Sequence, residues 1–235
     1  MEDRLSRARL LLGSKGLDAL SRIRVIVFGT GGVGSWCAEA LIRSGVTHLT
    51  IVDGDTVCPS NINRQMMATS RTVGQVKVDA IKERLIEINP EADITARHEV
   101  FTAETAGSFN LGDYDYIIDA IDSLKDKAEL ILRASETGAK LFSSMGAALK
   151  MDSTKISVAE FWNVRGCPLG SALRKRFRKT GCLPKKKFQC VYSEEVLENI
   201  DEGGVHVANG SLMHITAIFG CTLAGLIIKD FRTTP

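Results

Sequence analysis

A short apolar run that leads directly into a glycine-rich loop constrains the fold of this chain most strongly. Residues 23–28 are rich in β-branched side chains, which predicts a buried parallel strand. The loop at 29–35 reads Gly-Thr-Gly-Gly-Val-Gly-Ser, and a helical pattern follows over residues 33–44. Such a loop lets phosphate groups approach backbone N–H groups at the positive end of a helix. The glycines expected beside a nucleotide are Gly29, Gly31, Gly32 and Gly34.

Strand-like and helix-like segments continue to alternate as far as residue 150. We predict helices over residues 5–20, 74–89 and 124–137, and further strands over residues 48–53, 94–101, 114–119 and 140–144. This order predicts an α/β fold with a doubly wound, mostly parallel, Rossmann-like sheet. Ligands bind at the carboxyl ends of the strands in such sheets, so we expect the functional site there.

The pattern changes after residue 150. One strand is expected near residues 155–160, followed by a segment broken by proline and glycine, a basic loop or helix, and an apolar helix at 211–228. A chain of 235 residues is long enough for one large domain. We therefore expect a single domain, 1–235, made of an N-terminal helix (1–22), a nucleotide-binding core (23–150) and a C-terminal part (151–235).

The composition, with 44% hydrophobic and 25% charged residues, is typical of a soluble globular protein. The first residues lack the apolar core of a secretion signal. The apolar helix at 211–228 contains His214 and is only just long enough to span a membrane, so we expect a buried core helix and no membrane contact. The six cysteines form no Cys-x-x-Cys pair, which argues against a paired structural zinc site and favours a reducing, cytoplasmic compartment.

Positive charge is concentrated in one segment, although the net charge of the chain is only +2. Residues 174–187 carry eight basic side chains and no acidic one; without them the chain would have 22 basic and 28 acidic residues. This distribution is typical of a nucleic-acid footprint, but a solvated helix and loop would give the same pattern. The candidate nucleic-acid ligands are Arg174, Lys175, Arg176, Arg178, Lys179, Lys185, Lys186 and Lys187.

An acidic residue follows the second strand, where nucleotide-binding folds hold the ribose. Asp53 lies 24 residues after Gly29, and Asp55 is an alternative two residues further on. A carboxylate at this position can accept hydrogen bonds from ribose hydroxyls. The arrangement predicts a bound nucleotide but does not distinguish NAD from ATP.

The loop beyond the second strand favours ATP. It places Arg64 among the carboxamides of Asn61, Asn63 and Gln65. A planar guanidinium held by its own loop suits phosphate oxygens, which it can bind through two parallel hydrogen bonds. Taken alone, Arg64 is equally consistent with a surface ion pair.

Three further residues fit a site for the phosphates of ATP. Lys77 opens a predicted helix, and Asp119 and Asp122 follow a strand at the carboxyl edge of the sheet. Magnesium is usually held by one or two carboxylates together with substrate phosphates, which suits Asp122. A solvated helix start or a helix cap would explain each residue singly. With Arg64, however, they fit a cation-lined triphosphate site better.

Five separated elements of the chain resemble the ATP site of the ubiquitin-activating-like (ThiF/MoeB-like) adenylating superfamily. These are residues 29–35, Asp53, residues 61–65, Lys77 and residues 119–122, and the resemblance covers residues 4–150. The resemblance implies ATP and Mg²⁺ as cofactors. It also implies phosphate binding by Arg64 and Lys77, contact with the α/γ-phosphate region by Asn61, ribose binding by Asp53, and Mg²⁺ binding by Asp122.

The resemblance extends to the first predicted helix. Arg7 matches an arginine that members of the superfamily reach into the site of a partner subunit, which implies a homodimer supported by the C-terminal part. The residues expected to be catalytic are Arg64, Lys77, Asp122 and Arg7.

The C-terminal part distinguishes branches of the superfamily. Members that act on carrier proteins usually bear two Cys-x-x-Cys zinc pairs, which this sequence lacks. The basic run and the stretch Cys-Val-Tyr-Ser-Glu-Glu at 190–195 resemble instead the branch that dehydrates threonylcarbamoyladenosine in tRNA. That resemblance implies a tRNA substrate, with the threonylcarbamoyl side chain beside the anticodon cyclised at the expense of ATP through an acyl-adenylate.

Two alternatives remain open from the sequence. The same ATP site could adenylate the C-terminus of a small ubiquitin-like sulfur-carrier protein, with Cys182 or Cys190 accepting the acyl or sulfur group, because nearby cations lower the pKa of a thiol. A sulfur-transfer protein is then a possible partner. A non-catalytic NAD-binding or tRNA-binding module is the other alternative, but it would not need Arg64, Lys77 and Asp122 together.

Overall fold

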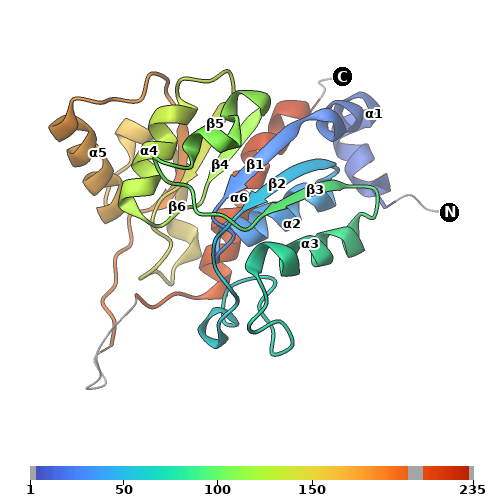
Figure 1. Cartoon of the computed structure of the whole chain (residues 1–235), viewed down its shortest axis with the longest axis horizontal. Coiled ribbons are helices and arrows are strands. Elements are labelled where there is room, and N and C mark those ends of the chain that lie inside the picture. The colour runs from blue at the N-terminus through green and yellow to red at the C-terminus, as the bar shows by residue number, and fades with distance from the viewer. Residues whose placement is uncertain (1–3, 201–208, 233–235) are drawn as a thin grey trace.

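A computed structural model describes residues 4–200 and 209–232, and its centre is a seven-stranded sheet (Figure 1). The strands are β1 (Arg24–Phe28), β2 (His48–Val52), β3 (Asp93–Arg97), β4 (Tyr116–Asp119), β5 (Lys140–Ser144), β6 (Ile156–Glu160) and β7 (Gln189–Ser193). Their spatial order is β3-β2-β1-β4-β5-β7-β6, and every neighbouring pair is parallel except β6 and β7. The predicted doubly wound α/β fold is confirmed.

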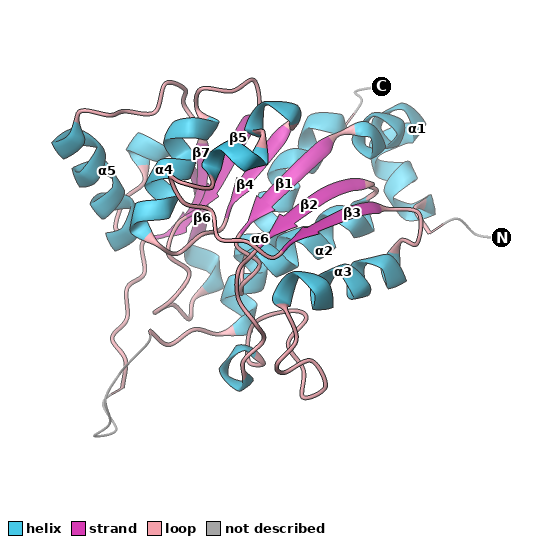
Figure 2. Ribbon diagram, in the orientation of Figure 1, coloured by secondary structure: helices cyan, strands magenta, loops and turns pink. Residues whose placement is uncertain are grey.

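Helices cover both faces of this sheet (Figure 2). They are α1 (Ser6–Arg22), α2 (Gly34–Ser44), α3 (Lys77–Ile88), α4 (Leu124–Ala134), α5 (Pro168–Thr180) and α6 (Met213–Ile228). Helices α1, α2, α3 and α6 contribute to the apolar core on one face, and α4 and α5 contribute to the core on the other. The sequence of β1 explains both layers, because Val25 and Val27 belong to the first core while Ile26 and Phe28 belong to the second.

The C-terminal part contributes two strands to the sheet, whereas the sequence predicted one. β7 inserts between β5 and β6, with Ser143 opposite Cys190 in the parallel pair and Ala159 opposite Cys190 in the antiparallel pair. The five residues of β7 are too short a run for periodicity to identify, and only pairing on both sides fixes them as a strand. The predicted strand at 94–101 is also shorter, since β3 ends at Arg97 and the chain then leaves the sheet.

Helix α6 packs along α2 in the first core. Ile215, Phe219, Leu223 and Ile227 are all fully buried on one of its faces. Among the described residues, one stretch, Met213–Phe231, is long and apolar enough to cross a membrane by length and composition, and 44% of it is buried inside the structure.

Candidate active site

The candidate site lies where the strand order reverses. β1 pairs with β2 on one side and with β4 on the other, so the loops that follow β1 and β4 diverge to opposite faces of the sheet. A cavity of about 840 Å³ opens at the carboxyl ends of these strands. Its walls include most of the predicted nucleotide-site residues, namely Gly29, Gly31, Gly32, Asp53, Asp55, Asn61, Arg64, Gln65, Lys77 and Asp122.

The glycine loop is shaped by close backbone contacts. Gly29 has φ of +82°, and a Cβ atom there would lie 2.6 Å from the carbonyl oxygen of Ala120. A Cβ atom at Gly34 would lie 1.8 Å from the carbonyl oxygen of Gly29, so only glycine lets α2 begin so close to the loop. Gly34 does not line the cavity, which differs from the expectation of a nucleotide contact and gives it a packing role.

Asp53 links the end of β2 to the glycine loop. Its Oδ2 accepts hydrogen bonds from the backbone N–H of Thr30 at 2.7 Å and from the Thr30 hydroxyl at 3.0 Å. Its Oδ1 accepts from the backbone N–H of Asp55 at 2.9 Å. A carboxylate has about four lone-pair positions, so Asp53 keeps acceptor capacity toward the cavity while its orientation is fixed.

Lys77 is a buried cation with one carboxylate partner. Its Nζ lies 2.7 Å from Asp55 Oδ2; the lysine side chain is 6% exposed and the aspartate side chain 68% exposed. The backbone N–H of Lys77 also donates to the carbonyl oxygen of Asp55 at 3.0 Å. Asp55 therefore positions Lys77 at the start of α3, while it also lines the cavity as the predicted alternative to Asp53.

The turn that carries Arg64 is held by contacts on both sides. Arg64 Nη1 donates to the carbonyl oxygen of Ser60 at 2.8 Å and to Asn63 Oδ1 at 2.9 Å. Trp36 Nε1 on α2 donates to the Arg64 carbonyl oxygen at 3.0 Å, and Asn61 Oδ1 accepts from the backbone of Cys58 at 3.0 Å. The guanidinium thus projects from a braced turn, with donors that remain available to a ligand.

The side-chain carbonyl oxygen of Gln65, a residue that lines the cavity, has no hydrogen-bond donor within the described residues. The residue is 6% exposed, and its Oε1 is buried without a hydrogen-bond partner among the described residues. A buried carbonyl oxygen is rarely left unpaired, because the loss of water is then uncompensated. A ligand or solvent in the cavity would satisfy this atom.

Asp119 departs from the prediction. It is fully buried and does not line the cavity. Its Oδ2 lies 2.9 Å from Lys127 Nζ and accepts from the Ser143 hydroxyl at 2.7 Å, while its Oδ1 accepts from the backbone of Ile121 at 3.2 Å. Both oxygens are engaged inside the protein, so Asp119 shapes the loop after β4 instead of reaching a nucleotide.

Asp122 stands at the exposed end of that loop, on the cavity wall. Within residues 4–200 and 209–232, its carboxylate makes no ion pair or hydrogen bond, which fits an Mg²⁺ ion bound jointly with substrate phosphates. In the same part of the chain, no three His, Cys, Asp or Glu side chains gather into a group that could hold a metal by themselves.

The helix that carries most of the predicted basic residues begins at the cavity, but the basic residues themselves do not line it. Cys167, Pro168 and Leu169 at the start of α5 line the cavity, and the helix and the loop 181–188 carry the eight cations. Arg7 is an exposed residue of α1, and it does not line the cavity. It is not brought to the cavity of its own chain.

The family profile named ThiF family matches residues 5–231, nearly the whole chain. The chain belongs to the ThiF family. It is 36% identical over 243 residues to the tRNA threonylcarbamoyladenosine dehydratase of Bacillus subtilis strain 168, an alignment that covers 98% of this chain and 95% of that protein. The predicted membership of the adenylating superfamily is therefore confirmed.

Solved structures agree with this ThiF-family assignment. The Escherichia coli tRNA N6-threonylcarbamoyladenosine dehydratase, TcdA, matches with a TM-score of 0.89 at 33% identity in complex with AMP, and 0.87 at 32% identity in complex with ATP. Each match covers 97% of this chain and 93% of the other. The Escherichia coli molybdopterin-synthase adenylyltransferase is 33% identical over 153 residues, which covers 65% of this chain and 59% of that protein.

Lys150 and Cys167 also line the cavity, and neither was predicted from the sequence. Lys150 is 4% exposed; its Nζ donates to the carbonyl oxygen of Ser193 at 3.3 Å and to that of Glu195. Burial lowers the pKa of Lys150. Cys167 at the start of α5 is 1% exposed. The position of Lys150 directly after the apolar stretch 145–149 could have marked it in the sequence. No sequence pattern marks Cys167.

The cysteines proposed as acceptors in the carrier-protein alternative have different surroundings. Cys190 is fully buried in β7, and this burial raises the pKa of its thiol well above the ordinary value, in spite of Lys127 nearby. A thiol in that state is a poor nucleophile at neutral pH. Cys182 is exposed in the loop after α5, and it does not line the cavity.

Proposed function

We propose that this protein uses ATP to dehydrate threonylcarbamoyladenosine in tRNA, closing the side chain of that nucleoside into a ring. The observation that carries the proposal is that the glycine loop, Arg64 and Lys77 line the same cavity as residues 144–150 and the start of basic helix α5. The relatives named tRNA threonylcarbamoyladenosine dehydratase align along nearly the whole chain, which includes both of these sets of residues.

Activation of a carboxylate is the first step that this arrangement supports. A carboxylate oxygen of the threonyl group attacks the α-phosphorus of ATP, and pyrophosphate leaves as an acyl-adenylate forms. Arg64 and Lys77 place two positive charges at the cavity wall, where they would stabilise the charge that moves onto the phosphates. The buried Lys77 is held in place by Asp55 before ATP arrives, so little reorganisation is needed.

Ring closure is the second step. The carbamoyl group of the same side chain attacks the activated carbonyl carbon, AMP leaves with the carboxylate oxygen, and a proton is released. Because both reacting groups are tethered, well-oriented attack of this kind has effective molarities of about 10⁵–10⁸ M. No enzyme nucleophile is required, which agrees with the burial of Cys190.

Mg²⁺ would be held by Asp122 together with the phosphates of ATP, where it would neutralise phosphate charge.

We also propose that the eight basic residues on α5 and the loop 181–188 dock the anticodon arm of the tRNA, and that the chain acts as a single-domain cytoplasmic enzyme. The position of Arg7, exposed and away from its own cavity, supports a homodimer in which it reaches the site of the partner subunit.

The decisive experiment incubates the protein with ATP, Mg²⁺ and threonylcarbamoyl-modified tRNA, and measures the mass of the modified nucleoside. Loss of one water from the nucleoside, with AMP and pyrophosphate as co-products, is the expected result. Unmodified tRNA provides the matched control. An unchanged nucleoside, with ATP–pyrophosphate exchange that responds only to a small sulfur-carrier protein, would replace the proposal with carrier adenylation.

A further inference from the structure

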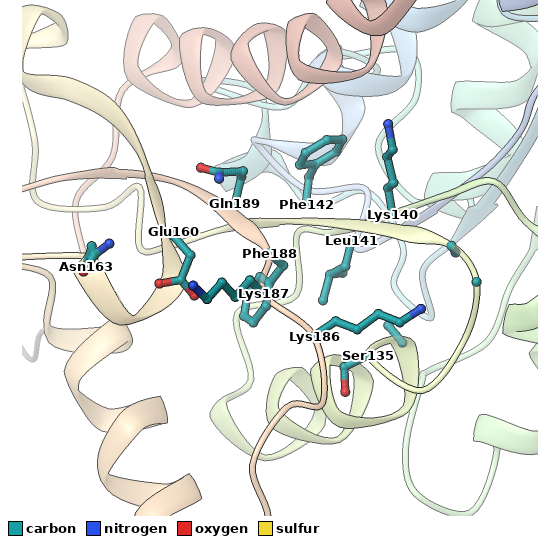
Figure 3. Close-up of a pocket in the computed structure, with 13 residues that line it drawn as sticks. Ser135, Lys140, Leu141, Phe142, Glu160, Asn163, Lys186, Lys187, Phe188 and Gln189 are labelled. Atoms are coloured by element: carbon teal, nitrogen blue, oxygen red, sulfur yellow. The ribbon is translucent and has the colours of Figure 1, made fainter.

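A second cavity, of about 530 Å³, lies at the opposite end of β5 from the candidate active site (Figure 3). Lys140, Leu141 and Phe142 of β5 line this cavity, Ser144 at the end of the strand lines the other, and no residue lines both. At about 3.3 Å per residue, Phe142 and Ser144 are about 7 Å apart along the strand. A ligand in the second cavity is therefore not the nucleotide that reacts.

The cavity exists because the sheet ends early at this edge. The first pair between β5 and β7 is Phe142 with Gln189, and Glu160 pairs with Gln189 on the other side of β7. The basic loop 181–188 precedes Gln189 in the chain and lies outside the sheet. Lys140 and Leu141 therefore extend past the last pair with β7, and the space beside them is open.

The basic loop forms a fixed wall of this cavity. The backbone N–H of Lys185 donates to the Ser135 hydroxyl at 2.9 Å, and its Nζ lies 2.8 Å from Glu136 Oε1. Lys186 Nζ donates to the carbonyl oxygen of Thr137, just after α4. These contacts hold the backbone of the loop beside α4, and the next residue, Lys187, is exposed and lines the cavity.

Glu160 supplies an unpaired acceptor in the same cavity. Its Oε2 accepts a hydrogen bond from the backbone N–H of Trp162 at 3.1 Å. Its Oε1 is buried and has no hydrogen-bond partner in the part of the chain that the structure describes. Figure 3 shows Glu160, Lys187 and Phe188 around the same hollow. A ligand with an N–H donor would satisfy the buried oxygen, and an anionic group would pair with Lys187.

We propose that this cavity binds one nucleotide of the RNA substrate, at a position other than the nucleotide that reacts. A base edge with an N–H group donates to Glu160 Oε1, and a backbone phosphate pairs with Lys187. The volume is in the range of pockets that take small ligands, and proteins recognise RNA largely through unstacked bases bound in this way. The proposal rests on the proposed function only in taking RNA as the substrate.

Replacement of Glu160 by glutamine tests the base contact by the sign of its effect. Removal of a negative charge beside a polyanion strengthens RNA binding if electrostatics alone matter. If the carboxylate accepts a hydrogen bond from a base, its loss weakens RNA binding instead. A hydrogen bond to a charged group contributes about 10-fold or more to affinity. We expect Glu160→Gln to bind labelled tRNA about 10-fold more weakly by fluorescence anisotropy. Equal or tighter binding would overturn the proposal.

A double-mutant cycle tests the pairing of the two residues. Lys187→Ser is compared with Lys179→Ser, which removes another exposed lysine, on α5 and outside the cavity. We expect each serine variant to lower the salt dependence of tRNA binding by about one phosphate contact. Only Lys187→Ser should be non-additive with Glu160→Gln, since both residues hold the same nucleotide. Additivity of both pairs would contradict a shared site.

A measurement on the unmodified protein covers the case in which Glu160→Gln does not fold. tRNA carrying photoreactive thionucleosides is crosslinked, and the attached peptides are mapped by mass spectrometry. Crosslinks to Asn163 or Phe188 are expected, and crosslinks confined to residues of the candidate active site would exclude the subsite. Free cytidine monophosphate that fills the cavity without displacing tRNA would also overturn the RNA assignment. Failure of nucleoside dehydration in the mass assay, by contrast, would overturn the proposed function itself.

Discussion

Lys127 Nζ lies 2.9 Å from Asp119 Oδ2, and neither side chain is exposed to solvent. The same ammonium group donates to the carbonyl oxygen of Ile121 at 2.8 Å. One buried cation thus joins the end of β4 to the loop that carries Asp122 to the cavity wall. The pair is fully enclosed, so each charge depends on the other for compensation.

Replacement of Lys127 by methionine should strongly destabilise the fold. The change leaves the Asp119 carboxylate buried without its cation, which costs about 3–5 kcal/mol in comparable pairs. Urea unfolding followed by circular dichroism measures the loss. Lys125→Met, at an exposed position on the same helix, is the matched control and should change the free energy of unfolding little. A loss below about 1 kcal/mol for Lys127→Met would show that the pair is not structural.

Arg64→Ala should reduce ATP–pyrophosphate exchange by about 10²–10³-fold, the range found when a preorganised donor to developing charge is removed. Arg64→Lys should recover little of this, because an ammonium group lacks the planar fork of donors. The matched control is Arg71→Ala, which removes an exposed arginine seven residues further along. Equal activities for the two alanine variants would remove Arg64 from the proposed chemistry.

Glu195 gives a prediction about pH. Its Oε2 accepts from the backbone N–H groups of Met151 at 2.7 Å and Asp152 at 2.9 Å. Hydrogen bonds from Asp152 and Met151 lower the pKa of this carboxyl below its ordinary value of 4.5. A depressed carboxyl pKa stabilises the fold above the unfolded pKa, and this contribution is lost as the pH falls through the folded pKa.

We therefore expect Glu195→Gln to be less stable than the unmodified protein at about pH 7. The difference should shrink progressively below pH 4.5. Urea unfolding at a series of pH values provides the measurement. Glu194→Gln, at the exposed neighbouring position, is the control and should show no such trend. A difference that stays constant down to acid unfolding would contradict the assigned hydrogen bonds.

The structure divides the eight basic residues into two groups. Arg174, Arg178, Lys185 and Lys186 contact groups of the protein itself. The other four, Lys175, Arg176, Lys179 and Lys187, are exposed, and within the described ranges their charged groups make no ion pair or hydrogen bond. The second group is therefore better placed to meet phosphates.

The double variant Lys175→Ser/Lys179→Ser should weaken tRNA binding and reduce its dependence on salt by about two phosphate contacts. Lys15→Ser/Arg22→Ser removes two exposed charges from α1 and is the matched control. Anisotropy titrations at several salt concentrations distinguish the two variants. The docking surface would have to lie elsewhere if both gave the same salt slope.

Local patterns determined much of the candidate site. The alternation of strands and helices fixed which strand ends meet at one edge, so the glycine loop, Arg64, Lys77 and Asp122 could be placed together from the sequence. The structure does bring them to one cavity. Their roles toward ATP are the part that the Arg64 experiment examines.

Other features depend on contacts between segments that are distant in the sequence. No periodicity could show that β7 enters the sheet between β5 and β6, and the second cavity is a consequence of where that pairing stops. Periodicity also could not show that Asp119 forms an ion pair with Lys127, or that Asp55 forms one with Lys77. Side-chain periodicity reports which residues face a core, whereas the partner of a buried charge is decided only when the strands and helices pack. The sequence determined the nucleotide-binding edge of this protein, and tertiary packing decided which charges remain available at it.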